Sequence, residues 1–153
     1  MKYKLLFACL AAVCVRGYAV GQQLSGQKSA TWQSYYKDEK VEIEYRYADC
    51  DIPSQGSSTE KIFLQFKNLT NAALKVSYEL ELQMGNNCFN CAGGDREFQK
   101  EVLLQPKQII TGICSENNPK VLEIFSKFRN YPNNSVLENH KVKNVIITEI
   151  NNK

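Results

Sequence analysis

The residues of this chain best suited to chemistry are four cysteines, Cys50, Cys88, Cys91 and Cys114. Cys9 and Cys14 lie in an N-terminal segment that we expect to be removed. An even number of cysteines in an exported chain is typical of a disulfide framework, and four cysteines allow three pairings. We favour Cys88 with Cys91 inside a short turn, and Cys50 with Cys114 across the domain.

The CxxC motif at Cys88 and Cys91 allows two sharper hypotheses. A thiol-disulfide oxidoreductase needs its CxxC at a helix N-terminus that lowers the thiol pKa, whereas this motif lies in a loop rich in Gly and Asn. A four-cysteine zinc site needs a second close pair, but Cys50 and Cys114 are single. We therefore expect two disulfides, no metal and no cofactor.

Few residues are available for hydrolytic chemistry. The one histidine, His140, lies in a polar stretch without a nucleophile motif around it, so we expect a surface position. Glu79 and Glu81 would share a face of an extended strand, but that face is opposite to the apolar row and should be solvated. We predict that the protein is not an enzyme and has no catalytic residue.

Residues 1–21 have the pattern of a secretory signal peptide. Lys2 and Lys4 precede an apolar run over residues 5–15, and small residues allow cleavage after Ala19 or after Gly21. The apolar run covers only about half of a hydrocarbon core of about 30 Å. We therefore predict a secreted or periplasmic protein with no transmembrane segment in the mature chain. Residues 22–34 are expected to form a flexible leader and residues 35–153 a single domain.

The targeting segment also carries the net charge of the chain. Lysine and arginine number 19 against 16 acidic residues, and three of the basic residues but none of the acidic ones lie before residue 22. The mature domain is therefore neutral overall. A neutral domain has no global field that would steer it to nucleic acid.

Apolar and polar residues alternate with period two along the body of the chain, which is typical of half-buried strands. The alternation covers residues 41–47, 62–66 and 74–84. A polar turn at 68–71 predicts that the second and third of these strands form a hairpin. Tyr45, Tyr47 and Tyr78 are in phase with the apolar rows, so we expect them in the core.

The second half of the chain adds four more strands. Residues 98–105 and 108–114 predict a hairpin with Pro106 and Lys107 in a type I turn. Residues 142–150 are rich in β-branched side chains and predict the last strand. Residues 121–128 suit a helix that begins at Asn118-Pro119 or a strand, and the surrounding strands favour the strand.

Seven short strands indicate an all-β fold, an immunoglobulin-like antiparallel β-sandwich, with a small β-barrel as the alternative. Trp32 precedes the first strand, so the tryptophan typical of immunoglobulin cores is not available. If the strands alternate in direction, the loops with the four cysteines lie at one end. We expect that end to be the contact region, with Phe89 and Asn90 as candidate contact residues.

Several segments in this order resemble small exported proteins of Bacteroidota: residues 36–47, residues 63–71, the CxxC loop, Leu104-Gln105-Pro106 and Gly112-Ile113-Cys114. The resemblance covers about residues 35–150. It implies an exported sandwich domain and brings no catalytic residue. We therefore expect a non-enzymatic domain that binds a protein or a surface glycan. A thiol-disulfide oxidoreductase that uses Cys88 and Cys91, or a secreted peptidase inhibitor, is the alternative.

The cysteine pattern yields a first test. Native mature protein should contain no free thiol, because export places all four mature cysteines in an oxidising compartment. Thiol titration in denaturant, on material isolated from its own compartment, measures this directly. Two or more reactive thiols per chain would contradict the disulfide framework.

Overall fold

The computed structural model describes residues 29–131 and 135–150. In this part of the chain no helix is long and apolar enough to cross a membrane. The predicted signal peptide lies outside the described residues. The elements are, in chain order, β1 Gln33–Lys37, β2 Val41–Ile52, η1 Pro53–Gln55, β3 Ser57–Asn68, β4 Ala73–Met84, β5 Asn87–Phe89, η2 Arg96–Phe98, β6 Gln99–Leu104, β7 Ile109–Thr111, η3 Lys120–Leu122, β8 Glu123–Phe128 and β9 Leu137–Ile150.

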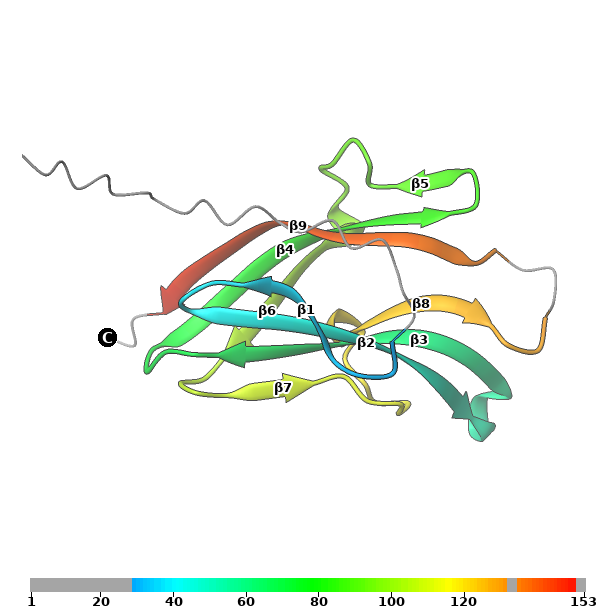
Figure 1. Cartoon of the computed structure of the whole chain (residues 1–153), viewed down its shortest axis with the longest axis horizontal. Helices are drawn as coiled ribbons and strands as arrows, with labels where there is room; N and C mark the ends of the chain where they lie inside the picture. Colours follow the sequence, from blue (N-terminus) through cyan, green and yellow to red (C-terminus); the bar gives the residue numbers. More distant parts are fainter. Residues whose placement is uncertain (1–28, 132–134, 151–153) are drawn as a thin grey trace, which may run out of the picture.

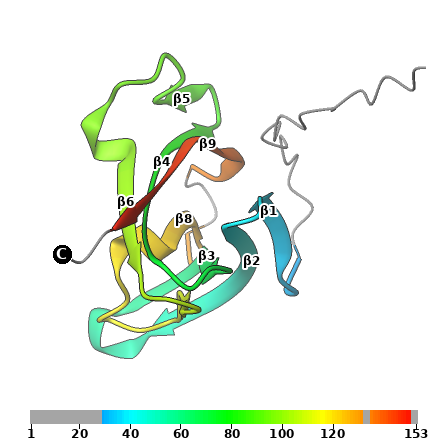
Figure 2. The same cartoon turned by 90° about the vertical axis from the view of Figure 1, so that its left-hand side faces the viewer.

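The strands form two antiparallel sheets, which confirms the predicted all-β sandwich (Figures 1 and 2). Sheet A contains β1, β2, β3, β7 and β8, and sheet B contains β4, β5, β6 and β9. The central strand of sheet A is β3, which pairs with β2 on one edge and with β7 and β8 on the other. The central strand of sheet B is β4, which pairs with β5, β6 and β9.

The core lies between the inner faces of β3 and β4. Period-two alternation turns Ile62, Leu64 and Phe66 of β3 toward the core, where each is fully buried. The rings of Phe66 and Tyr78 meet across the two sheets with centroids 5.6 Å apart. Tyr45 and Tyr47 are also buried, so the three tyrosines predicted for the core are in it.

A second, smaller cluster lies on the outer face of sheet A, away from the core. Cys50, Ile52 and Phe63 form it, and Trp32 packs against them from the segment before β1. Cys50 pairs with Cys114 at a Cα–Cα distance of 5.4 Å. This is the pairing that we favour from the sequence, but it fastens the segment after β7 to the outside of its own sheet. In antibody domains the corresponding disulfide joins the two sheets.

Both predicted hairpins are wrong, because each turn carries the chain from one sheet to the other. The turn after β3 leads from sheet A to sheet B, and the turn after β6 leads back. Alternation indicates which face of a strand is buried, but a polar turn of the same length serves a hairpin and a crossover equally well. Lys107 has φ +59°, so the Pro106-Lys107 turn belongs to type II and not to the predicted type I.

The two crossovers lie against each other around the buried side chain of Asn68. Its Nδ2 donates to the carbonyl oxygens of Ala72 and Gln105, at 2.8 Å each, and so joins both turns. Its Oδ1 accepts a hydrogen bond from the backbone N–H of Thr70 at 2.8 Å. Asn68 therefore links the backbones of the two turns through one buried side chain.

The remaining predictions concern element boundaries. Residues 123–128 form a strand after a single 3-10 turn, as favoured, and the last strand begins five residues earlier than expected, at Leu137. The predicted leader is too long, because β1 already begins at Gln33. Trp32 explains this difference, since its packing against the second cluster fixes the chain just before β1.

The disulfides should differ in their effect on stability. Replacing both Cys50 and Cys114 with Ala should lower the free energy of unfolding by about 4 kcal/mol, against about 2 kcal/mol for the Cys88 and Cys91 pair, because the longer closed loop restricts the unfolded chain more. Urea titration of both double variants measures the difference. Equal losses, or mass-spectrometric linkage of Cys50 to Cys88 or Cys91, would show that the pairing is wrong.

Candidate functional site

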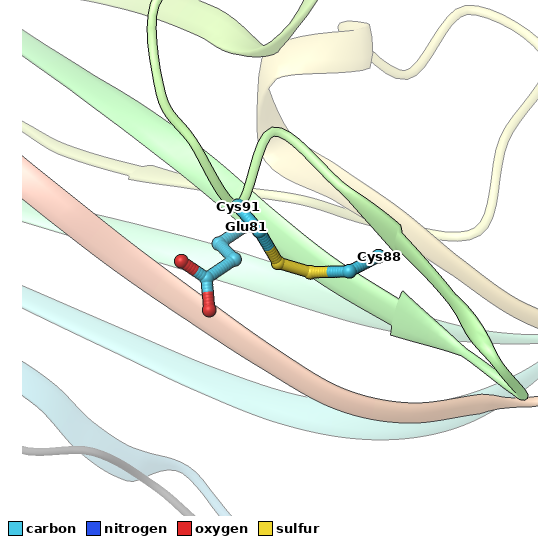
Figure 3. A group of neighbouring side chains, drawn as sticks. All are labelled: Glu81, Cys88 and Cys91. Carbon is cyan, nitrogen blue, oxygen red and sulfur yellow. A yellow bond between two sulfur atoms is a disulfide. The ribbon is translucent and has the colours of Figure 1, made fainter.

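The CxxC motif lies in a compact loop that folds back over the outer face of sheet B, the face turned away from the core. Cys88 is on β5, opposite Gln83 of β4, and pairs with Cys91 at a Cα–Cα distance of 5.8 Å. Both cysteines are exposed to solvent. Figure 3 shows them on the same side of β4 as the carboxylate of Glu81.

Asn90 holds this loop in place. It has φ +57°, a left-handed conformation that Asn tolerates better than most residues. Its Nδ2 donates to the carbonyl of Leu80 at 2.9 Å, and its Oδ1 accepts from the backbone N–H of Asp95 at 3.1 Å. The carbonyl of Asn90 accepts from the N–H of Gly93 at 3.1 Å. The loop is therefore fixed by hydrogen bonds as well as by its disulfide.

Glu81 lies beneath the disulfide and is held by two lysines of β9. Lys141 donates to Oε1 at 2.9 Å and Lys143 to Oε2 at 3.0 Å. The hydrogen bond from Lys141, with a further one from Lys143, lowers the pKa of Glu81 against the opposing effect of partial burial. Glu81 was expected to be solvated, but the β4–β9 register places it in an ion-pair cluster.

The surroundings of the motif differ from those of a redox-active CxxC. The motif is on a strand and a turn, without the helix N-terminus that lowers the pKa of a catalytic thiol. A carboxylate oxygen of Glu81 and both sulfur atoms lie within 4.8 Å of one another, and the charge of this carboxylate is paired with Lys141 and Lys143. The geometry therefore does not favour redox catalysis by this motif.

A shallow groove of about 360 Å³ lies beside the loop on the same outer face. Its walls include Ser77 and Glu79 of β4, Glu101 of β6, and Asn144 and Ile146 of β9. The register of β9 shifts between Lys143 and Ile146, and Asn144 takes φ +53° at this bulge. Bulges bend a strand and redirect its side chains, so the bulge shapes this wall of the groove.

Sequence analysis missed the groove, although Asn144 within a run of β-branched residues was an available signal. Isolated Asn residues tolerate positive φ and can mark a bulge in a strand pattern.

The four cysteines do not form one contact surface. Both views place the loop that carries β5 at the top of the molecule and the β2–β3 connection, next to Cys50, at the bottom (Figures 1 and 2). The expectation of one common contact region considered the direction of the strands but not the sheet to which each belongs, and the two disulfides belong to opposite sheets. Of the two candidate contact residues, Phe89 is 40% exposed and its ring packs on Phe98. Asn90 is turned into the loop that it supports.

His140 is in the core, so the predicted surface position is wrong. It is 1% exposed, and its Nδ1 is 2.6 Å from the hydroxyl of Tyr35 on β1. The rings of Tyr45 and Tyr47 also contact it, with centroids 5.4 and 6.0 Å away. The polar residues around His140 in the sequence concealed its position, because the register of β9 against Leu82 turns it inward.

Comparison with known proteins gives this fold and site no further identity: no family model, no curated protein and no solved structure matches the chain. The groove and the disulfide loop must therefore be interpreted from their own chemistry.

The buried histidine should make folding acid-sensitive. Desolvation lowers the pKa of His140 from 6.5 to about 4. Below pH 6.5 the unfolded chain therefore binds a proton that the folded chain does not bind until about pH 4. Stability should fall by up to about 3 kcal/mol as the pH drops through this window and level off below it.

Urea titrations of wild type and His140→Gln across pH 4 to 7 separate this effect from a general loss of stability. The variant should lack the His140 contribution to the slope, whatever its absolute stability. Equal slopes for both proteins would contradict the assignment.

Proposed function

We propose that this protein is an exported, non-enzymatic domain that binds a partner protein through the outer face of sheet B. The signal-peptide pattern and the two disulfides support a secreted or periplasmic location. We also propose that the sandwich is of the immunoglobulin-like class. Such scaffolds place binding residues on faces and loops that a rigid core supports.

The observation that carries the proposal is exposed apolar surface next to the groove. Ile146 on β9 is 62% exposed and Leu103 on β6 is 58% exposed. In the register of β4, Ile146 lies opposite Ser77 and Leu103 opposite Lys75, so both belong to this outer face. Exposed apolar side chains surrounded by polar residues are typical of protein interfaces, which have an apolar centre and a polar rim.

The same face fits a glycan less well. Sugar rings pack on exposed aromatic side chains, but Tyr78, the aromatic residue that lines the groove, is 2% exposed. Ser77, Gln99 and Glu101 could donate or accept hydrogen bonds from either ligand. The exposed apolar residues Ile146 and Leu103 therefore favour a protein partner over a glycan.

Two alternatives make different demands on the molecule. An oxidoreductase that uses Cys88 and Cys91 would reduce insulin at a rate abolished by Cys91→Ser. A peptidase inhibitor would block a protease through an exposed loop, for which Phe89 is available. The position of the motif on a strand and a turn, without a helix N-terminus, argues against the first alternative.

Introduction of a charge at the apolar contact tests the proposal. Leu103→Asp and Ile146→Asp should each weaken partner binding at least tenfold, because a buried charge would lie in the interface. Ile109→Asp is the matched control, since Ile109 is also 58% exposed but lies on β7 of sheet A. The proteins serve as baits on the envelope and secreted fractions of the source cells, with thermal melting as the folding check.

The expected result is a protein captured by wild type and by Ile109→Asp but not by the two variants of sheet B. Capture that survives both sheet B changes, or that Ile109→Asp abolishes, would refute the proposed face. Release of the bound material by glycosidase treatment would favour the glycan.

A further inference from the structure

We propose that the two thiols formed when Cys88–Cys91 is reduced, together with Glu81, make a binding site for one zinc ion. The inference concerns the exposed loop and does not rest on the proposed partner face. It follows from three features: the donor atoms, the way the loop is held, and the lysines around Glu81.

The donor atoms are already gathered. The two sulfur atoms and a carboxylate oxygen of Glu81 all lie within 4.8 Å of one another (Figure 3). Thiolate and carboxylate bind Zn²⁺ at about 2.3 Å and about 2.1 Å, so neighbouring ligands of a tetrahedral ion lie about 3.5 Å apart. Small side-chain rotations would bring these atoms to that spacing. The fourth position would remain for water.

Reduction should leave the loop in place. β5 pairs with β4 from Leu82 to Met84, independently of the disulfide. Asn90 adds its side-chain bonds to Leu80 and Asp95. The two cysteines would therefore remain on either side of the Asn90 turn, close to Glu81, when the S–S bond is broken.

The lysines of β9 would become outer partners of the metal ligand. Each carboxylate oxygen has two lone pairs, so Lys141 and Lys143 can keep their hydrogen bonds while one oxygen binds the ion. Hydrogen-bonded carboxylates are usual around metal sites, because the outer partner fixes the orientation of the ligand.

A dithiol is the reductant that opens the Cys88–Cys91 disulfide in this proposal. The dithiol supplies two electrons and two protons to the Cys88–Cys91 bond and leaves as a disulfide. Zn²⁺ then replaces one proton on each thiol, and both protons go to solvent. Three anionic ligands attract the divalent cation, and the ammonium groups of Lys141 and Lys143 offset part of this negative charge. The disulfide and the metal site are therefore mutually exclusive states of one loop.

Cobalt(II) is a spectroscopic probe for this site and zinc its competitor. The full mature protein is treated with a dithiol under argon, freed of reductant, and checked by mass spectrometry of alkylated thiols. One equivalent of cobalt should bind with thiolate-to-cobalt charge-transfer absorption, and zinc should displace it. The oxidised protein should show no such absorption.

Variants test each ligand under identical conditions. Cys88→Ser with Cys91→Ser should abolish the absorption, even if Cys50 and Cys114 are also reduced. Glu81→Gln should keep the thiolate absorption but weaken binding at least about tenfold, the lower end of what even an outer partner contributes to metal affinity. Glu101→Gln removes a carboxylate from β6 on the same face and should bind like wild type.

The proposal is overturned if the reduced wild type binds cobalt no more tightly than the double serine variant. It is also overturned if Glu81→Gln binds as tightly as wild type, because the site would then be a dithiol without a carboxylate. Circular dichroism of each reduced protein shows whether the sandwich is intact, so a loss of binding can be assigned to the ligands.

Discussion

Packing of β3 against β4 is the interaction on which the rest of the structure depends. Each is the central strand of its sheet, and the other strands of sheet B all pair with β4. In sheet A, β2, β7 and β8 pair with β3, while β1 attaches through β2. The inner residues of β3 and β4 are buried in a single cluster, which also contains inner residues of the adjacent strands. Burial of such apolar side chains is the largest favourable contribution to a domain of this size.

The sequence predicted the properties that depend on a single strand. Alternation from Val41 to Tyr47 and from Leu74 to Met84 predicts which side chains face the core, because a strand has only two faces. Cysteine spacing favours the two disulfides, because a CxxC loop closes on itself more readily than on a distant residue. The buried faces and the Cys88–Cys91 pairing are local properties, and Cys50–Cys114, with a sequence separation of 64, is the pairing that then remains.

The sequence did not predict the features that depend on which of the two sheets a strand joins. The turns after Asn68 and Leu104 have hairpin length and composition, yet both are crossovers, because tertiary packing decides which sheet receives the next strand. His140 was hidden for a related reason, since its burial follows from the register of β9 and from Tyr35 on the other sheet. The groove also arises from register, through the bulge at Asn144.

The two disulfides have separate tasks in this architecture. Cys50–Cys114 is anchored by a fully buried cysteine and secures the long connection between β7 and β8 to sheet A. Cys88–Cys91 is exposed and closes a loop that Asn90 already supports. It closes the shorter of the two loops, so it should contribute less to stability than Cys50–Cys114.

The hydrogen bonds of Asn68 between the two crossovers also restrict how the protein can be produced. Asn68-Leu69-Thr70 has the form of an acceptor for N-linked glycans. The amide nitrogen that would carry the sugar is the atom that joins the two crossovers, and the residue is buried. An oligosaccharide on this nitrogen would therefore be incompatible with the native arrangement of the two crossovers. In a eukaryotic secretory pathway, modification of the nascent chain at this sequon would compete with folding, whereas a host that does not attach N-linked glycans avoids the conflict.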